Sequence, residues 1–139
     1  MRGEVSALGL DIGRKRIGVA GCDRTGLIAT GLTTLEQNSF SEVLVNLAAI
    51  AKERRAEMLV VGLPLTLDGL EGRQAKQVRR VAERLSRALQ LPVIYVDERL
   101  TSVEAEELIR RQGCSPRQDK ALVDRKAAAI ILQRWLDQR

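Results

Sequence analysis

The sequence contains no histidine among its 139 residues. This absence excludes Ser–His and Cys–His catalytic pairs, and it excludes every zinc site that uses histidine ligands. Chemistry carried out by this chain must therefore use carboxylates, lysines, hydroxyl groups or a metal ion bound by carboxylates.

Cysteines, aromatic residues and long apolar runs are also scarce. Cys22 and Cys114 lie far apart and form no CxxC pair, which predicts free thiols in a reducing compartment. Aromatic residues make up 2% of the chain, too few for a protein that stacks bases on exposed aromatic platforms. No apolar run approaches the roughly 20 residues that span a bilayer, and residues 1–13 lack the apolar core of a signal peptide. We therefore expect a cytoplasmic protein with no membrane partner.

Basic residues outnumber acidic ones, 23 to 18, which gives a formal net charge of +5. An excess of this size favours a polyanionic partner such as nucleic acid. Because aromatic platforms are missing, we expect such a partner to be held through its phosphates and its shape.

Short apolar runs predict five strands. Three runs are joined by short turns, which indicates antiparallel neighbours, and two are reached through helical segments, which indicates parallel pairing. The runs are residues 5–13, 15–22, 26–35, 57–65 and 91–96.

Four segments place apolar residues at helical spacing, and Ser39 or Ser41 could cap the first of them. The segments are residues 39–55, 72–90, 102–112 and 119–137. The expected fold is therefore α/β, a five-stranded mixed sheet (three-strand antiparallel meander plus two parallel strands) flanked by helices. The length fits a single domain, residues 1–139.

Acidic residues end two of the predicted apolar strands. Asp11 ends the first strand, and Asp97 and Glu98 follow the last. An ionised carboxylate beside a core is costly unless it is paired or bound to metal. The alternatives are a turn aspartate for Asp11 and a helix cap for Asp97 and Glu98. Thr101, with Glu104 three residues later, can supply that cap instead.

Asp124 lies on the apolar side of the last predicted helix, together with Ala127, Ala128 and Ile131. An acid on the packed side of a helix is unusual, and the alanines would allow a close approach to the sheet. The alternative is an acid in an early turn, favoured by the helix dipole.

These acids are all expected at one edge of the sheet, because ligands in such sheets bind beyond the carboxyl ends of the parallel strands. The prediction is a carboxylate site in which Asp11, Glu98 and Asp124 bind metal and Asp97 is a further catalytic residue. Oxygen ligands select Mg²⁺ or Mn²⁺, and two such ions can hydrolyse a phosphodiester bond without histidine. Nearby basic residues are expected to hold phosphates, the alternative being a solvated surface: Arg14, Lys15, Arg16, Arg99, Lys120 and Arg125.

Four segments carry a resemblance to a known family: LGLDIGRKRIGVA, VVGLPLTLDG, VDERLTSVEA and VDRKAAAIILQRWL. Together they closely resemble the YqgF family, also called RuvX, of bacterial ribonuclease-H-like proteins. The resemblance implies a ribonuclease-H-like fold and an acidic site made of Asp11, the Asp97–Glu98 pair and Asp124. Two positions depart from the family pattern, since Arg14 replaces a threonine and Thr66 an asparagine.

The resemblance also implies an activity, namely a divalent-metal-dependent nuclease in 5′-end processing of pre-16S rRNA. The alternatives are a Holliday-junction or branched-DNA nuclease and a nucleic-acid-binding protein with weak catalysis. A monomer and a homodimer are both open. The first motif also resembles the phosphate loop of actin-like ATPases and sugar kinases, but those proteins need two such lobes.

Overall fold

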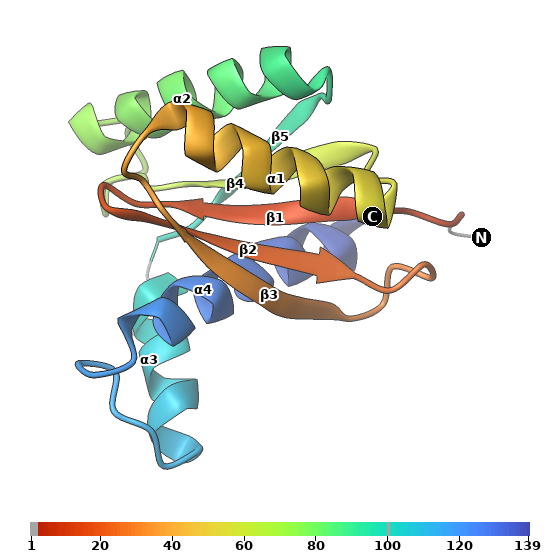
Figure 1. Cartoon of the computed structure of the whole chain (residues 1–139). Helices are drawn as coiled ribbons and strands as arrows, with labels where there is room; N and C mark the ends of the chain where they lie inside the picture. Colours follow the sequence, from red (N-terminus) through yellow and green to blue (C-terminus); the bar gives the residue numbers. More distant parts are fainter. Residues whose placement is uncertain (1–2, 100) are drawn as a thin grey trace.

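A five-stranded mixed sheet forms the centre of the computed structural model, which describes residues 3–99 and 101–139 (Figure 1). The strand order is β3-β2-β1-β4-β5; the first three are antiparallel neighbours, and β4 is parallel to both β1 and β5. This confirms the predicted meander and the two parallel additions. The strands are β1 (Ala7–Ile12), β2 (Arg16–Cys22), β3 (Ala29–Glu36), β4 (Met58–Leu63) and β5 (Val93–Asp97).

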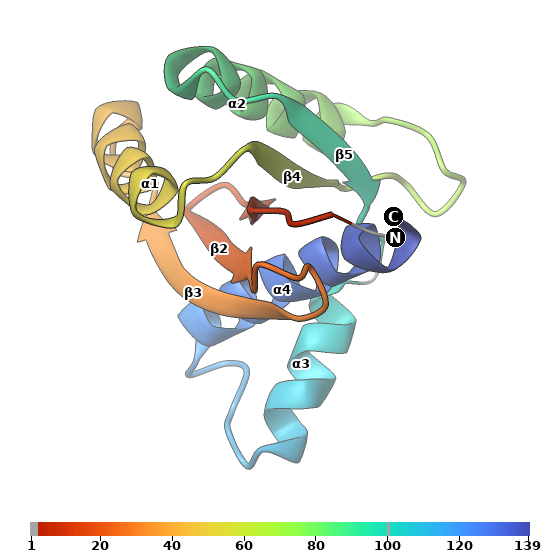
Figure 2. The same ribbon diagram turned by 90° about the vertical axis from the view of Figure 1, so that its right-hand side faces the viewer.

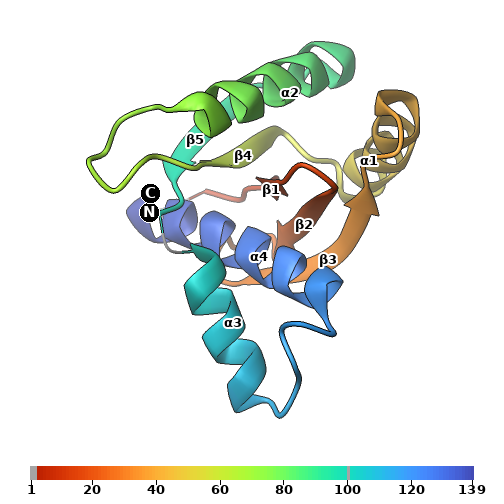
Figure 3. The ribbon, with the colours of Figure 1, turned by 90° about the vertical axis from the view of Figure 1, so that its left-hand side faces the viewer.

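Helices cover both faces of the sheet, as Figure 1 shows. Helices α1 and α2 pack on one face and α4 on the other, while α3 packs on α4 and projects away from the sheet (Figures 2 and 3). The helices are α1 (Phe40–Arg54), α2 (Arg73–Leu89), α3 (Thr101–Arg111) and α4 (Lys120–Gln138). None of the described helices is long and apolar enough to cross a membrane.

The ends of the elements lie within a few residues of their predicted positions. Ser39 caps α1, because its hydroxyl accepts from the backbone N–H of Glu42 at 3.2 Å. The largest difference is at β3, expected from residue 26. The side chain of Asp23 accepts from the N–H groups of Leu27 and Ile28 and holds this stretch in the turn. The cap expected at Thr101 falls on a side chain outside the described part of the structure.

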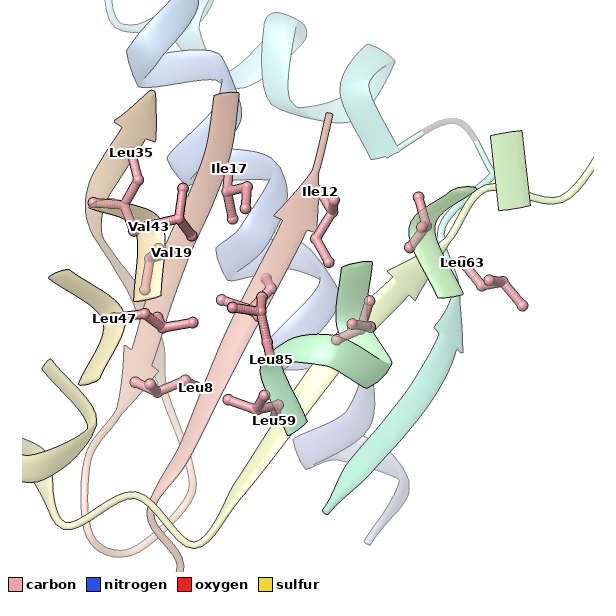
Figure 4. Close-up of a cluster of buried hydrophobic side chains, with 14 of the residues drawn as sticks. Leu8, Ile12, Ile17, Val19, Leu35, Val43, Leu47, Leu59, Leu63 and Leu85 are labelled. Carbon is pink, nitrogen blue, oxygen red and sulfur yellow. The ribbon is translucent and has the colours of Figure 1, made fainter. Parts of the chain in front are cut away.

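Alternation along β1 assigns its side chains to two cores. Leu8, Leu10 and Ile12 pack beneath α1 and α2, and Figure 4 shows Leu8 and Ile12 in this layer. Ala7 belongs to the smaller core beneath α4. Because side chains alternate along a strand, Asp11 points to the same face as Ala7. Strand β1 therefore presents its one carboxylate, that of Asp11, to α4.

Helix α4 approaches the sheet backbone to backbone. A Cβ atom added to Gly18 would lie 1.9 Å from the carbonyl oxygen of Asp124, and one added to Gly9 would lie 2.8 Å from that of Ala128. Ala127 and Ala128 are buried in this contact. The close approach predicted from the alanines is confirmed, and it needs glycine on the strands as well as alanine on the helix.

Candidate functional site

Asp11 and Glu98 form a pair of adjacent carboxyl groups on the α4 face of the sheet, joined by a side-chain hydrogen bond. Asp11 lies near the end of β1. Glu98 directly follows β5, and its N–H donates to the carbonyl of Leu63 at 3.2 Å, which extends the pairing of β4 and β5 by one residue. Both side chains are partly buried. Two strands separated by β4 thus deliver the two acids to one place.

The pair holds protons more tightly than ordinary carboxylic acids. Burial is the main cause that raises the pKa of Asp11 to about 6, and the negative charge of Asp124 adds to it. Burial, followed by the charge of Asp11, raises the pKa of Glu98 to about 9. Near neutral pH, the pair therefore tends to keep one proton between its two carboxyl groups. Two desolvated acids that repel each other are a place where positive charge binds favourably.

Asp124 lies next to this pair. Its backbone lies directly over Gly18, and Gly18 is the register partner of Asp11 across the β1–β2 ladder. Its carboxylate accepts from the Nε atom of Arg16 at 2.5 Å. Those two side chains are 30% and 20% exposed, so solvent screens the ion pair only in part. Asp124 therefore acts on Asp11 through its charge while its own charge is balanced by Arg16.

The predicted convergence of three carboxylates on one point is not seen in the arrangement described here. Within residues 3–99 and 101–139, no three Asp, Glu or Cys side chains are grouped closely enough to hold a metal ion. Asp11 and Glu98 meet each other, but the carboxylate of Asp124 turns to Arg16. The guanidinium group of Arg16 thus compensates the charge of Asp124, while Asp11 and Glu98 contact each other.

Asp97 lies apart from Glu98, although the two are neighbours in sequence. Its carboxylate accepts from the backbone N–H of Arg99 at 2.9 Å and from the Arg99 Nε atom at 2.8 Å. Arg99 in turn donates to the carbonyl of Leu67 at 3.1 Å. The hydrogen bond from Arg99 is the main cause that lowers the pKa of Asp97. Consecutive residues at a strand end point to opposite faces, so the side chain of Asp97 points away from that of Glu98. Through Arg99, Asp97 ties the β5–α3 turn to the loop after β4.

The predicted basic residues divide into three places. Arg14 and Lys15 are exposed in the β1–β2 turn. Lys120 lines an open cavity of about 750 Å³ with Arg16 and Asp124. Arg125 directs its Nε atom to the hydroxyl of Thr34 on β3, at 3.4 Å. Arg99, described above, lies on the side of Asp97. The predicted basic residues thus lie mainly in the β1–β2 turn and at the start of α4.

Arg134 is a charged neighbour of the site that the sequence pattern did not single out. It donates to the backbone carbonyl of Asp97 at 3.1 Å and pairs with Glu104. Its charge opposes the rise in the pKa of Glu98. Arg134 lies three residues after Ile131 on the stripe of α4 that carries Asp124. That spacing was the feature of the sequence by which Arg134 could have been assigned to the site.

Known proteins match this chain along nearly its whole length. The family model RuvX, described as Holliday junction resolvase, matches residues 5–138. A protein of Synechococcus elongatus, named "Putative pre-16S rRNA nuclease", is 60% identical over 134 residues, which are 96% of this chain and 90% of the relative. A protein of Crocosphaera subtropica with the same name is 62% identical over 135 residues, covering 97% and 94%.

Among solved structures, T. thermophilus RuvC in complex with a Holliday junction substrate has the same fold. Its TM-score is 0.58 at 15% identity, covering 97% of this chain and 95% of that chain. The structural match confirms the ribonuclease-H-like architecture, and the family match covers all four motifs. We conclude that the chain belongs to the RuvX family of nucleases, described as Holliday junction resolvases.

Proposed function

We propose that the chain is a divalent-metal-dependent phosphodiester nuclease that processes the 5′ end of pre-16S rRNA in the cytoplasm, with residues 1–139 acting as one nuclease domain. The observation that carries this proposal is the Asp11–Glu98 pair, with Asp124 held beside it by α4. The high identity to relatives named for pre-16S rRNA supports the choice of substrate.

The side chains of the site fit a divalent cation. Asp11, Glu98 and Asp124 offer only carboxylate oxygens, the ligands that Mg²⁺ and Mn²⁺ prefer. A cation would replace the proton between Asp11 and Glu98 and would compete with Arg16 for Asp124. When bound, two such ions supply an activated water and charge stabilisation for the leaving oxygen.

The remaining residues of the chain position the substrate and the acids. Arg14 and Lys15 are exposed on the turn that follows Asp11, where they can contact phosphate oxygens without displacing another partner. Lys120 and Arg125 extend the basic surface along the start of α4. Such contacts orient a strand but carry no base specificity.

Two proposed roles belong to the side of Asp97. We assign Asp97 to catalysis indirectly, through its hold on Arg99, which fixes the turn that carries Glu98. Arg99 is the phosphate contact on that side. Both roles depend on the turn keeping Glu98 next to Asp11.

A nuclease for Holliday junctions or branched DNA is the second candidate, and the fold of RuvC favours it. Symmetric cleavage of a junction needs two active sites, so this candidate implies a homodimer. A monomer suffices for trimming rRNA. A nucleic-acid-binding protein with weak catalysis is the third candidate, and the buried acid pair speaks against it, since binding alone gains nothing from clustered carboxylates.

Cleavage assays on one set of labelled nucleic acids test these candidates. Precursor 16S rRNA, a four-way junction and linear duplex DNA are incubated with Mg²⁺, Mn²⁺ or EDTA. We expect metal-dependent cleavage of the precursor, and we expect Asp11→Asn to abolish it. Asp137→Asn, which changes an exposed acid at the far end of α4, is the matched control and should cleave normally. If Asp11→Asn cleaves at the wild-type rate, Asp11 is not part of the active site.

A further inference from the structure

A second cavity opens on the opposite face of the same sheet edge and shares no side chain with the acid pair. Its volume is about 600 Å³, within the range of sites that enclose small ligands. Three segments form its polar rim: the β1–β2 turn, the residue after β3 and the start of α2. The rim side chains are Arg14, Gln37, Arg73, Gln74 and Gln77.

The bottom of this cavity is apolar. Ile12 of β1 lines it together with Val78 and Val81 of α2, and Ile12 and Val78 are buried core residues. Ile12 directly follows Asp11, so alternation along β1 sends the two side chains to opposite faces. The cavity and the acid pair are therefore separated by little more than the thickness of the sheet at the end of β1.

The β1–β2 turn links the two places. The side-chain amide of Gln37 donates to the carbonyl of Gly13, and its backbone N–H donates to the carbonyl of Lys15 at 2.8 Å. Gln37 is thereby fixed against the turn that carries Arg14. A nucleic-acid strand that crosses this turn would contact both faces of the sheet edge.

The cavity carries positive charge with nothing to neutralise it among its lining residues. Neither an aspartate nor a glutamate lines it, whereas Asp97 lines another cavity and Glu106 and Asp124 line a third. Helix α2 begins beside it without a side-chain cap and without an acid in its first turn. The helix therefore adds its positive end to the charges of the arginines.

We propose that this cavity binds one unpaired nucleotide of the substrate strand, next to the bond that is cut. Guanidinium groups of Arg14 and Arg73 match a phosphate, because their fork of N–H donors fits its oxygens. Amides of Gln74 and Gln77 can both donate to and accept from a base edge. The apolar bottom covers the face of the base.

This assignment deepens the proposed nuclease function and rests on it, since it names the class of substrate. A base held in a cavity must be unstacked and unpaired. The preferred substrate is therefore a partly single-stranded nucleic acid, and a continuous duplex is a poor one.

The test compares binding of two labelled RNA hairpins that differ only in a single-stranded 5′ overhang. Fluorescence anisotropy is measured in EDTA, so that no cleavage occurs. We expect Arg73→Gln to weaken binding of the overhang hairpin by about tenfold, the effect of losing one hydrogen bond to a charged group. The double variant Gln74→Ala/Gln77→Ala should weaken it by about the same factor, because it loses two neutral hydrogen bonds. Binding of the blunt hairpin should change less than twofold. Arg80→Gln is the matched control, an exposed arginine of the same helix that lines none of the described cavities.

A second measurement reads the cavity directly. The side-chain amide NMR signals of Gln37, Gln74 and Gln77 are followed as adenosine or uridine 5′-monophosphate is added to the wild type. We expect these signals to shift and those of Gln133, on α4, to stay. The proposal is overturned if the glutamine signals do not shift, or if the variants weaken both hairpins equally. Cleavage that survives such a result leaves the nuclease proposal standing, and discrimination between hairpins without any cleavage overturns the nuclease proposal alone.

Discussion

Replacing Gly18 by alanine tests whether backbone contact between α4 and the sheet positions the acids. The added Cβ would lie 1.9 Å from the carbonyl oxygen of Asp124 and 2.3 Å from its carbonyl carbon, whereas ordinary contacts begin near 3.4 Å. Neither atom belongs to a flexible side chain. The start of α4 must therefore move outward by about 1.5 Å, and Asp124 moves with it.

The structure gives the size of both effects. Overfilling a packed contact costs about 1–3 kcal/mol, and a rigid backbone neighbour places Gly18→Ala at the upper end, about 3 kcal/mol. For a chain of this length that corresponds to a fall in melting temperature of roughly 10 °C. A displacement of about 1 Å in a catalytic group lowers the rate by about 100-fold. We therefore expect a folded protein with a lower melting temperature and almost no cleavage.

Calorimetry and the cleavage assay are run on a graded series of glycine variants. Gly3→Ala is the neutral control, because its Cβ would meet nothing within 4 Å. Gly31→Ala is intermediate, with a contact of 3.0 Å to the carbonyl oxygen of Arg125. The losses of melting temperature and of cleavage should increase from Gly3→Ala to Gly31→Ala and be largest for Gly18→Ala. A Gly18→Ala protein as stable and as active as the wild type would refute the contact and the placement of Asp124 that depends on it.

Three further predictions concern the charges of the site. Asp11→Asn should leave the melting temperature in EDTA level or raise it, because it removes a buried negative charge that repels its neighbours; a lower melting temperature contradicts this. Without metal, the free energy of unfolding should fall as pH rises from about 4 towards 9, because folded Glu98 and Asp11 keep protons that the unfolded chain releases, at about 1.4 kcal/mol per proton and pH unit. Urea titrations across this range measure it, and a flat profile counts against the pair. Arg16→Gln should bind Mn²⁺ about fivefold more tightly by calorimetry, since it frees Asp124 from a partly screened ion pair; weaker binding would mean that Arg16 positions Asp124 for the metal.

The sheet and its helices follow from local patterns of the sequence. Short turns between the first three apolar runs dictate antiparallel pairing, and helical crossovers dictate parallel pairing. What the pattern misplaced was the start of β3. Leu27 and Ile28 are apolar and look like strand residues, but the carboxylate of Asp23 binds their N–H groups first. A local hydrogen bond of this kind overrides side-chain preference and leaves little trace in hydropathy.

The site was predictable where an acid interrupts an apolar pattern. Asp11 and Asp124 stand out for this reason, and the structure places both on the facing surfaces of β1 and α4. Asp97 and Glu98 look like one pair in the sequence, yet alternation at the end of β5 sends them to opposite faces. Applying the alternation of strand side chains one residue beyond the end of β5 is enough to separate them.

The cavity beside α2 left no comparable signal in the sequence. Arg14, Gln37 and Arg73 come from three segments, and each is an ordinary polar residue in its own segment. Only the packing of α2 across the end of β1 brings them together. Periodicity reports which face of an element is buried, but it does not report which exposed side chains of distant elements become neighbours.

The seat of α4 on the sheet also sets the order in which a growing chain can acquire its site. Helix α4 is the last described element to leave the ribosome, and it carries Asp124. Before it docks, the small core beneath α4 stays open to water. Domains assemble as units during synthesis. A nascent chain therefore lacks Asp124 beside Asp11 and Glu98 until α4 has been made and has docked on the sheet.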